Sequence, residues 1–435
     1  MEITAKTASD IFEQVRSSVL TGKLKPGTAL PSVRELASEL EINRNTVAAA
    51  YKKLVDHGIV ISRGRKGTFI SEVDSVFTLE GTPPGLALKD LAGGNPAVAL
   101  LPRITPDAGF SLSAHRMYGE PAVNPALESL GREWLGQDLY HAFELNLTNG
   151  AVDAIERLLA DSLIAGDKVI VEDPCFLSSI NTLKNLRLTP VGISVDDEGM
   201  QDEILAEQLK QGAQAIIITP RAHNPTGCGL SKIRAARIKA LLNAHPEVLI
   251  IIDDHFSLLS SCDYYDVIPE GATRWALIRS TSKFLGPDMR LAFVASDIET
   301  SFRLRKRLNS GTNWVSHILQ DIVTDIMKSP QFHKELSQVK ETYRAKRENL
   351  IRDLKNNNIH VPTSHDGLNI WIPLNVDIDA VIMQLAQHGW LVRNGEVFSV
   401  QASSKGLRIS VSSLNETTSA IFVKSLSLVL HNQHH

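Results

Sequence analysis

The chain has 435 residues, more than one domain usually holds, so two or three domains are expected. Hydrophobic residues make up 43% and charged residues 22%, which excludes a chain that is disordered or collagen-like throughout. Three scattered cysteines exclude a disulfide framework and a cysteine-rich zinc site, and no metal is expected. The sequence lacks a signal peptide and any apolar run near the roughly 20 residues of a membrane span, so a cytoplasmic protein that contacts no membrane is expected.

Charge is distributed unevenly along the chain. Residues 1–71 contain 11 Lys and Arg against 7 Asp and Glu, a net charge of +4. The remaining residues contain 34 against 42, a net charge of -8, so the whole chain carries -4. A small basic unit joined to a large acidic one predicts that only the first unit meets the phosphates of a nucleic acid.

The first 71 residues predict three helices followed by a β-hairpin. Apolar residues at helical spacing favour helices over 8–21 and 44–57, and Ser32 with Glu35 forms a capping box that begins another helix between them. The short connection between the second and third helices makes them a helix-turn-helix. Two β-rich runs around a basic, glycine-containing turn then predict a winged hairpin.

The third helix is the expected recognition helix. The first residues of such a helix reach base edges in the major groove, where Arg pairs with guanine and Asn with adenine. The residues that would contact bases are Arg44, Asn45 and Thr46. Those that would hold phosphates are Arg34, Arg63, Arg65 and Lys66. On this pattern alone, a protein-binding module with solvated charges remains an alternative.

Four segments of this unit together are more specific than the helix-turn-helix pattern. They are LPSVRELA at 30–37, NRNTV at 43–47, YKKL at 51–54 and GTFI at 67–70. This combination resembles the winged-helix domain of GntR-type bacterial regulators over residues 5–71. The resemblance implies double-stranded DNA as a partner.

Residues 72–91 break the periodicity around a Gly-Thr-Pro-Pro-Gly segment and predict a linker, so the expected domains are 1–71, 72–91 and 92–435. Beyond the linker, strand-like apolar runs alternate with helix-length amphipathic segments. The runs are 168–171, 215–219, 248–252, 275–280 and 291–295. This alternation predicts an α/β domain with a mostly parallel sheet, whose ligands gather at the carboxyl ends of the strands.

Polar residues follow several of these runs, and one helix start precedes them. In chain order they are Gly150, Asn224, Asp253, Asp254, Ser280, Lys283 and Arg290. A helix N-terminus, a hydroxyl and an Arg suit a phosphate group, an Asp suits a ring nitrogen, and a Lys suits an aldehyde. Pyridoxal 5'-phosphate needs this set of groups.

The order and spacing of these residues resemble fold type I aminotransferases across roughly 92–415, including a small C-terminal subdomain. The resemblance implies Lys283 as the catalytic lysine that forms the Schiff base with the cofactor. The phosphate would be held by Gly150, Ala151, Val152, Ser280 and Arg290. The pyridine ring would be held by Phe176, which stacks on it, Asn224, which bonds its hydroxyl, and Asp253, which pairs with its nitrogen.

Three more residues acquire roles from the same resemblance. Arg408 matches the arginine that grips the α-carboxylate of a substrate or effector, and Tyr118 matches a tyrosine that reaches the partner's cofactor in a head-to-tail dimer. His255 would lie beside the cofactor ring, where the family usually has Tyr, and the segment after Tyr118 also departs from the family pattern. Asp254 is the alternative to Asp253, because neighbouring strand residues point to opposite faces.

A GntR-like winged helix followed by an aminotransferase-like domain resembles the MocR family of bacterial transcriptional regulators over nearly the whole chain. The resemblance implies a homodimer on an operator with two half-sites, whose binding responds to pyridoxal phosphate or to its adduct with an amine effector. Vitamin B6 metabolism is the expected regulated process. The alternative is a genuine aminotransferase with an N-terminal tethering module, but a tether does not need the residues at 44–46 beside a basic wing.

Overall fold

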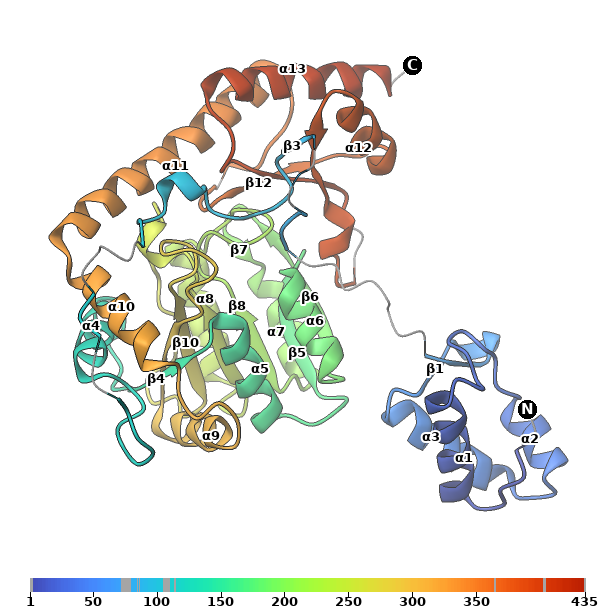
Figure 1. Cartoon of the computed structure of the whole chain (residues 1–435). Coiled ribbons are helices and arrows are strands. Elements are labelled where there is room, and N and C mark those ends of the chain that lie inside the picture. Colours follow the sequence, from blue (N-terminus) through green and yellow to red (C-terminus); the bar gives the residue numbers. More distant parts are fainter. Residues whose placement is uncertain are drawn as a thin grey trace. The chain divides into compact units, whose positions relative to one another are not determined.

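The computed structural model describes residues 3–71, 80–83, 85, 87–104, 110–112, 115–363, 365–401 and 404–433. The chain forms two units, one within residues 1–78 and the other holding residues 79–163 and 167–435 (Figure 1). In the described part of the chain, no helix is long and apolar enough to cross a membrane.

The first unit is the predicted winged helix-turn-helix. Its elements are α1 (Ala8–Leu20), α2 (Val33–Glu39), α3 (Arg44–Asp56), β1 (Val60–Ser62), η1 (Gly64–Lys66) and β2 (Thr68–Ile70). The strands pair antiparallel, with Ile61 opposite Phe69, and the 3₁₀ turn η1 forms the tip of the wing. The predicted helices at 8–21 and 44–57 are confirmed, each ending one residue earlier than expected.

Local contacts fix the ends of these helices. Ser32 Oγ accepts a hydrogen bond from the Glu35 amide at 3.2 Å, and the Ser32 amide donates to Glu35 Oε2 at 2.8 Å, so the predicted capping box is confirmed. Tyr51 of α3 donates its hydroxyl proton to the Pro31 carbonyl at 2.8 Å, which holds α3 against the start of α2. The two helices of the helix-turn-helix therefore keep a fixed orientation.

The second unit is built on an eight-stranded sheet with the order β4-β11-β10-β9-β8-β5-β6-β7. The strands are β4 (Glu144–Thr148), β5 (Lys168–Asp173), β6 (Thr189–Asp196), β7 (Gly199–Met200), β8 (Ala215–Ile218), β9 (Leu249–Asp253), β10 (Trp275–Ser280) and β11 (Ala292–Ser296). Neighbours from β10 to β6 are parallel, whereas β11 is antiparallel to both its neighbours and β7 to β6. The predicted mostly parallel sheet is confirmed.

Helices cover both faces of the sheet, which explains why its central strands β8 and β9 have consecutive apolar residues rather than alternating ones. One core packs α5 (Ala151–Ser162), α6 (Leu177–Asn185) and α9 (Ile298–Asn309). The opposite core packs α4 (Pro125–Gly136), α7 (Asp202–Lys210), α8 (Lys232–Asn243) and α10 (His317–Lys328). In β9, Leu249 and Ile251 enter the α5 core, while Ile250 and Ile252 enter the opposite one.

The long helix α11 (Pro330–Asn356) leads to a small C-terminal subdomain, also as predicted (Figure 1). Its sheet has the order β12-β15-β14, and helices pack on it. The elements are β12 (Asn369–Pro373), α12 (Ile378–Gln387), β13 (Trp390–Leu391), β14 (Arg393–Asn394), β15 (Gly406–Ser410) and α13 (Glu416–Asn432).

The end of the predicted linker packs with this second unit. Residues Lys89–Asp90 form β3, which pairs parallel with β13, and the Gly81 amide donates to the Gly93 carbonyl at 3.0 Å. Residues 72–79 of the predicted linker lie outside the described residues. The described residues between 80 and 91 are thus part of the second unit's framework.

Candidate cofactor site and DNA-binding surface

The register of the large sheet brings the predicted phosphate-binding residues together. Thr148 at the end of β4 and Ser280 at the end of β10 both lie opposite Ala292, the first residue of β11. Because β11 runs opposite to its neighbours, its beginning lies at the same edge as their carboxyl ends. Gly150, two residues after β4, and Arg290, two residues before β11, therefore meet beside Ser280.

Gly150 and Arg290 form a tight cradle at the start of α5. Gly150 is the N-cap with φ +97°, and a Cβ there would lie 2.6 Å from Arg290 Nη2, so a side chain would fill the cradle. Arg290 Nη2 also donates to the Asn149 carbonyl at 3.1 Å. Among the described side chains, none caps the first amides of α5, which include those of Ala151 and Val152. Free helix amides beside a guanidinium suit a phosphate group.

Asp253 ends β9 at the same edge, with its carboxylate available. It is buried, and within the described part of the chain its Oδ1 atom accepts no hydrogen bond. His255 Nδ1 lies 3.5 Å from this oxygen. A buried carboxylate oxygen without a donor is costly, which suits a ligand that brings a protonated ring nitrogen.

Asp254, the alternative for that role, is fully engaged on the opposite face of the sheet. Its two oxygens accept from Arg221 Nε and Nη2, each at 2.8 Å, and from Arg279 Nε at 2.9 Å. Arg279 is fully buried in β10 and also contacts Asp138. Neither Arg221 nor Arg279 was expected to have a role, although Arg279 lies within an apolar strand, where a buried guanidinium needs a carboxylate partner.

Two buried titratable groups, Glu172 and His223, lie near Asp253. Burial raises the pKa of Glu172 to about 8, although its carboxylate accepts a hydrogen bond from the Thr219 amide at 2.7 Å. Burial, with a smaller effect of His255, lowers the pKa of His223 to about 3. His223 Nε2 lies 3.9 Å from Glu172 Oε2. Both shifts favour the uncharged forms of these buried groups, so burial leaves Asp253 as the carboxylate of this edge that a cationic ligand would meet.

Lys283 follows β10 at the centre of this edge. Its Nζ donates to the Gly94 carbonyl at 3.1 Å. Burial lowers the pKa of Lys283, against the opposing attraction of Glu80. A lowered pKa increases the fraction of neutral amine, the form that attacks an aldehyde.

Glu80, which was not predicted as a site residue, lies near Lys283. Both Asn224 and Arg408 donate hydrogen bonds to it. Arg408 of β15 is fully buried, and its Nη1 donates to Asn224 Oδ1 at 3.1 Å and to the two oxygens of Glu80 at 2.6 and 2.8 Å. Asn224 Nδ2 donates to Glu80 Oε1 at 3.1 Å. No local pattern identifies Glu80, because its partner is 328 positions away.

Two predicted residues stand apart from these contacts. Phe176 is half-buried at the N-cap of α6, three residues after the end of β5 and thus at the same edge of the sheet. Tyr118 is 86% exposed, and its ring packs edge-on against Trp314 with centroids 5.3 Å apart. Within one chain Tyr118 is not brought to Lys283, and its role towards a partner's cofactor stays a prediction.

The predicted base-reading residues are exposed at the start of α3. Asn43 caps the helix by accepting a hydrogen bond from the Asn45 amide at 2.8 Å, and this leaves the side chains of Arg44 and Asn45 in solvent. Thr46 is half-buried. The small residues Ala48 and Ala49 are also exposed, which lets the helix backbone approach a groove closely.

The predicted phosphate-holding residues lie on α2 and the wing. Arg34 and Lys66 are exposed, and the guanidinium of Arg63 lies 5.2 Å from the centroid of the Phe69 ring. The side chain of Arg65 lies outside the described residues.

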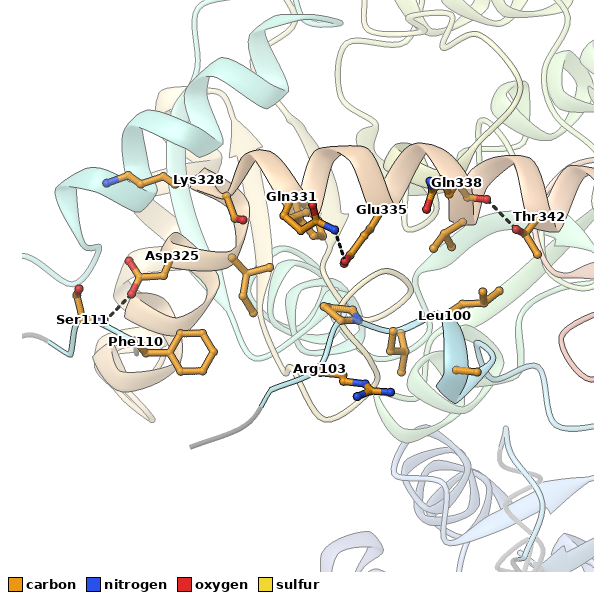
Figure 2. Close-up of a pocket in the computed structure, with 17 residues that line it drawn as sticks. Leu100, Arg103, Phe110, Ser111, Asp325, Lys328, Gln331, Glu335, Gln338 and Thr342 are labelled. Carbon is orange, nitrogen blue, oxygen red and sulfur yellow. Dashed lines mark hydrogen bonds between the residues drawn. The ribbon is translucent and has the colours of Figure 1, made fainter. Parts of the chain in front are cut away.

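A separate groove of about 850 Å³ lies between the α10–α11 corner and the segments 99–103 and 110–111 (Figure 2). The Ser111 amide donates to Asp325 Oδ2 at 2.6 Å at one end of it, and Gln331 donates to Glu335 at 2.8 Å along α11. Its lining contains none of the predicted site residues.

Comparison with known families divides the chain in the same way. Residues 7–70 match the bacterial regulatory proteins of the gntR family, and residues 91–426 match aminotransferase class I and II. The vitamin B6 salvage pathway transcriptional repressor PtsJ of Salmonella typhimurium is 49% identical over 95% of this chain and 96% of its own length. The probable rhizopine catabolism regulatory protein MocR of Rhizobium meliloti is 22% identical over 92% of this chain and 85% of its own.

Solved structures share the fold of the second unit. The kynurenine aminotransferase of Pyrococcus horikoshii superposes with a TM-score of 0.71 at 19% identity, over 80% of this chain and 92% of that one. The α-aminoadipate aminotransferase LysN of Thermus thermophilus, complexed with N-(5'-phosphopyridoxyl)-L-leucine, gives a TM-score of 0.69 at 20% identity, over 80% and 93%. At these identities the likeness establishes the fold alone.

Proposed function

We propose that this chain, which belongs to the MocR-type family of DNA-binding transcriptional regulators, makes its operator binding depend on pyridoxal 5'-phosphate. The observation that supports this most is the set of complementary groups at one edge of the large sheet. The Gly150–Arg290 cradle, the donor-free oxygen of Asp253 and the amine of Lys283 match the phosphate, ring nitrogen and aldehyde of that cofactor.

Each end of the cofactor has residues that would hold it. The amides of Ala151 and Val152, with Ser280 and Arg290, would bind the phosphate. Asp253 would pair with the ring nitrogen, with His255 beside it. The remaining groups are Phe176, which would stack on the ring, Asn224, which would bond its hydroxyl, and Lys283, which would bond to the aldehyde carbon. When bound, pyridoxal phosphate supplies an electrophilic carbon and an electron-accepting ring.

The regulated process that we propose is vitamin B6 salvage. The 49% identical relative is a transcriptional repressor of that pathway, and a regulator that binds a B6 vitamer can report its supply directly. We further propose that the chain acts as a homodimer on an operator with two half-sites, because one winged helix reads only one half-site.

Attachment of the cofactor is the first test. Apo protein reconstituted with pyridoxal phosphate should turn yellow, and borohydride reduction followed by peptide mass spectrometry should place the added mass on Lys283. The variant Lys283→Ala should lose both signals. Lys346→Ala is the matched control, because Lys346 is a partly buried lysine of the same unit that contacts the Ser412 carbonyl at 2.7 Å. A visible band that survives Lys283→Ala, with the mass on another lysine, would contradict the assignment.

The alternative function, a genuine aminotransferase, is tested by steady-state transamination assays with several amino acids and oxo acids. Turnover at rates typical of metabolic enzymes, roughly 1–10³ per second, would favour that alternative. We expect no such turnover.

A further inference from the structure

Glu80 occupies the position on Arg408 that a ligand carboxylate would need. The two Glu80 oxygens lie 2.6 and 2.8 Å from Arg408 Nη1, and the guanidinium lies 5.0 Å from the centroid of the Phe398 ring. Arg408 has no exposed surface, while 23% of the Glu80 side chain is exposed. A buried guanidinium needs an anion, and here the chain itself supplies one.

The surroundings of this ion pair are shaped for it. Gly94 has φ +64°, which disfavours a side chain, and a Cβ there would lie only 3.0 Å from Glu80 Oε2 and 3.2 Å from Arg408 Nη2, so glycine lets the backbone approach the ion pair closely. The carbonyl of Gly94 accepts the hydrogen bond from Lys283. The ion pair and the lysine of the cofactor site are therefore separated by a single residue.

The charges nearby keep Glu80 ionised. Burial alone would raise the pKa of Glu80, but Arg408, Lys283 and Arg393 together outweigh it, and the net shift is downward from the ordinary value. Glu80 is therefore a carboxylate at neutral pH and fills the same electrostatic role as the carboxylate of a free amino acid.

Glu80 also lies at the start of the second unit, which begins at residue 79, just after the unit that contains the winged helix. The next residue is anchored as well, because Gly81 donates its amide proton to Gly93 at 3.0 Å and its carbonyl accepts from Arg393 Nη2 at 3.1 Å. The contacts of Glu80 and Gly81 thus hold the first described residues of the second unit in place.

We propose that Glu80 is an internal substitute for the carboxylate of an α-amino acid, so that an amino acid binds Arg408 only by displacing Glu80 and releasing the segment 80–83. The inference rests on the proposed function, because the amine of such a ligand would face Lys283 and the cofactor. Under this proposal an α-amino acid is a second signal, which acts by releasing residues 80–83. Glu80 would also keep ordinary amino acid substrates from binding at Arg408. A ligand shifts the protein from the form with Glu80 on Arg408 to the form with Glu80 displaced only if it binds the second form more tightly.

The competition is tested by titrating the reconstituted protein with L-alanine and measuring binding by calorimetry and by the change in the visible spectrum. Glu80→Gln and Glu80→Ala should bind L-alanine at least about tenfold more tightly than the wild type, a difference of about 1.4 kcal/mol. Glu203→Gln, which neutralises an exposed glutamate of α7, should leave the affinity unchanged. Equal or weaker binding by both Glu80 variants would overturn the proposal.

Release of the segment is tested in the wild type by hydrogen exchange of the peptide that covers residues 80–93. Saturating L-alanine should speed exchange of the Gly81 amide at least about tenfold, and Glu80→Ala should show the fast rate without ligand. L-Alanine binding that leaves this amide protected would overturn the proposal. Neither readout involves DNA, so a failure of the cofactor to change operator affinity would sink the proposed function and leave this result standing.

Discussion

The winged-helix unit and the aminotransferase-like unit hold their functional residues in opposite ways. Arg44 and Asn45 lie in solvent at a helix start that neighbouring residues fix. In contrast, Asp253, Lys283 and Arg408 come from strands or strand ends far apart in the sequence, and both Asp253 and Arg408 are buried. The difference teaches that in the first unit the functional residues are separate from the core, whereas in the second unit binding residues and stabilising residues lie next to each other among buried side chains.

The largest predicted difference is between two adjacent carboxylates of the second unit, Asp253 and Asp254. Asp254→Asn should lower the free energy of unfolding by about 3–5 kcal/mol, because it removes the fully buried carboxylate that pairs with Arg221 and Arg279 and leaves them only the partly exposed Asp138. Asp253→Asn should change it by much less and should instead weaken binding of pyridoxal phosphate. Urea unfolding of the apo variants measures both. Equal losses of stability would contradict the division of roles between the two residues.

On the DNA-binding surface, Arg44→Ala should weaken binding to a specific operator by about 1–3 kcal/mol and leave binding to random DNA nearly unchanged. Lys66→Ala, on the wing, should weaken both alike and reduce the salt slope of binding by about one. Neither variant should change the thermal stability of the protein. Electrophoretic titrations at several salt concentrations check this, and equal losses on both kinds of DNA for Arg44→Ala would refute base reading by that residue.

The buried acid behind the cofactor site predicts a pH effect in the second unit. The pKa of Glu172 is raised to about 8 from an ordinary 4.5, so between these values the folded state binds more protons than the unfolded state. The free energy of unfolding therefore falls as pH rises through this window. Glu172→Gln cannot titrate and should raise the Tm of the apo protein by about 2–4 °C at pH 9, but not at pH 4. A gain of equal size at both pH values would point to packing instead.

The smallest predicted effect concerns the capping box of α2. Ser32→Ala should cost about 1 kcal/mol of stability in the first unit, because the Glu35 amide loses its acceptor. Ser38→Ala, the same substitution at an exposed position within α2, is the control and should be neutral or slightly stabilising. Hydrogen exchange of the α2 amides separates the two variants, and equal protection in both would show that the cap contributes nothing.

Sequence reasoning reached further in the first unit than in the second, for a physical reason. Caps and apolar spacing are short-range signals, so α1 and α3 were predicted to within a residue. The strands of the large sheet were also found where they are apolar on both faces, but β4, whose end carries the helix start at Gly150, was not identified as a strand. The run at 291–295 predicts β11 itself, but no local pattern reveals that β11 is antiparallel and pairs with β4.

The candidate site shows the same limit. Motif spacing selected Lys283, Asn224 and Arg408, which the structure brings together, but it left Asp253 and Asp254 open. Only the partners of Asp254, both distant in sequence, separate the two. Glu80 could not be found at all, because it lies in a segment without periodicity and acts through a pairing across almost the whole second unit.

The most direct test of the central claim, that cofactor occupancy controls DNA binding, is the dissociation constant of the wild-type protein for an operator fragment selected from genomic DNA. The constant should be measured for apo protein and for protein saturated with pyridoxal phosphate, with Lys283→Ala as the matched variant. We predict constants that differ by about 5–150-fold between the apo and holo forms, the range of ordinary allosteric coupling, and a smaller difference in Lys283→Ala. Equal constants for apo and holo wild-type protein would contradict the claim.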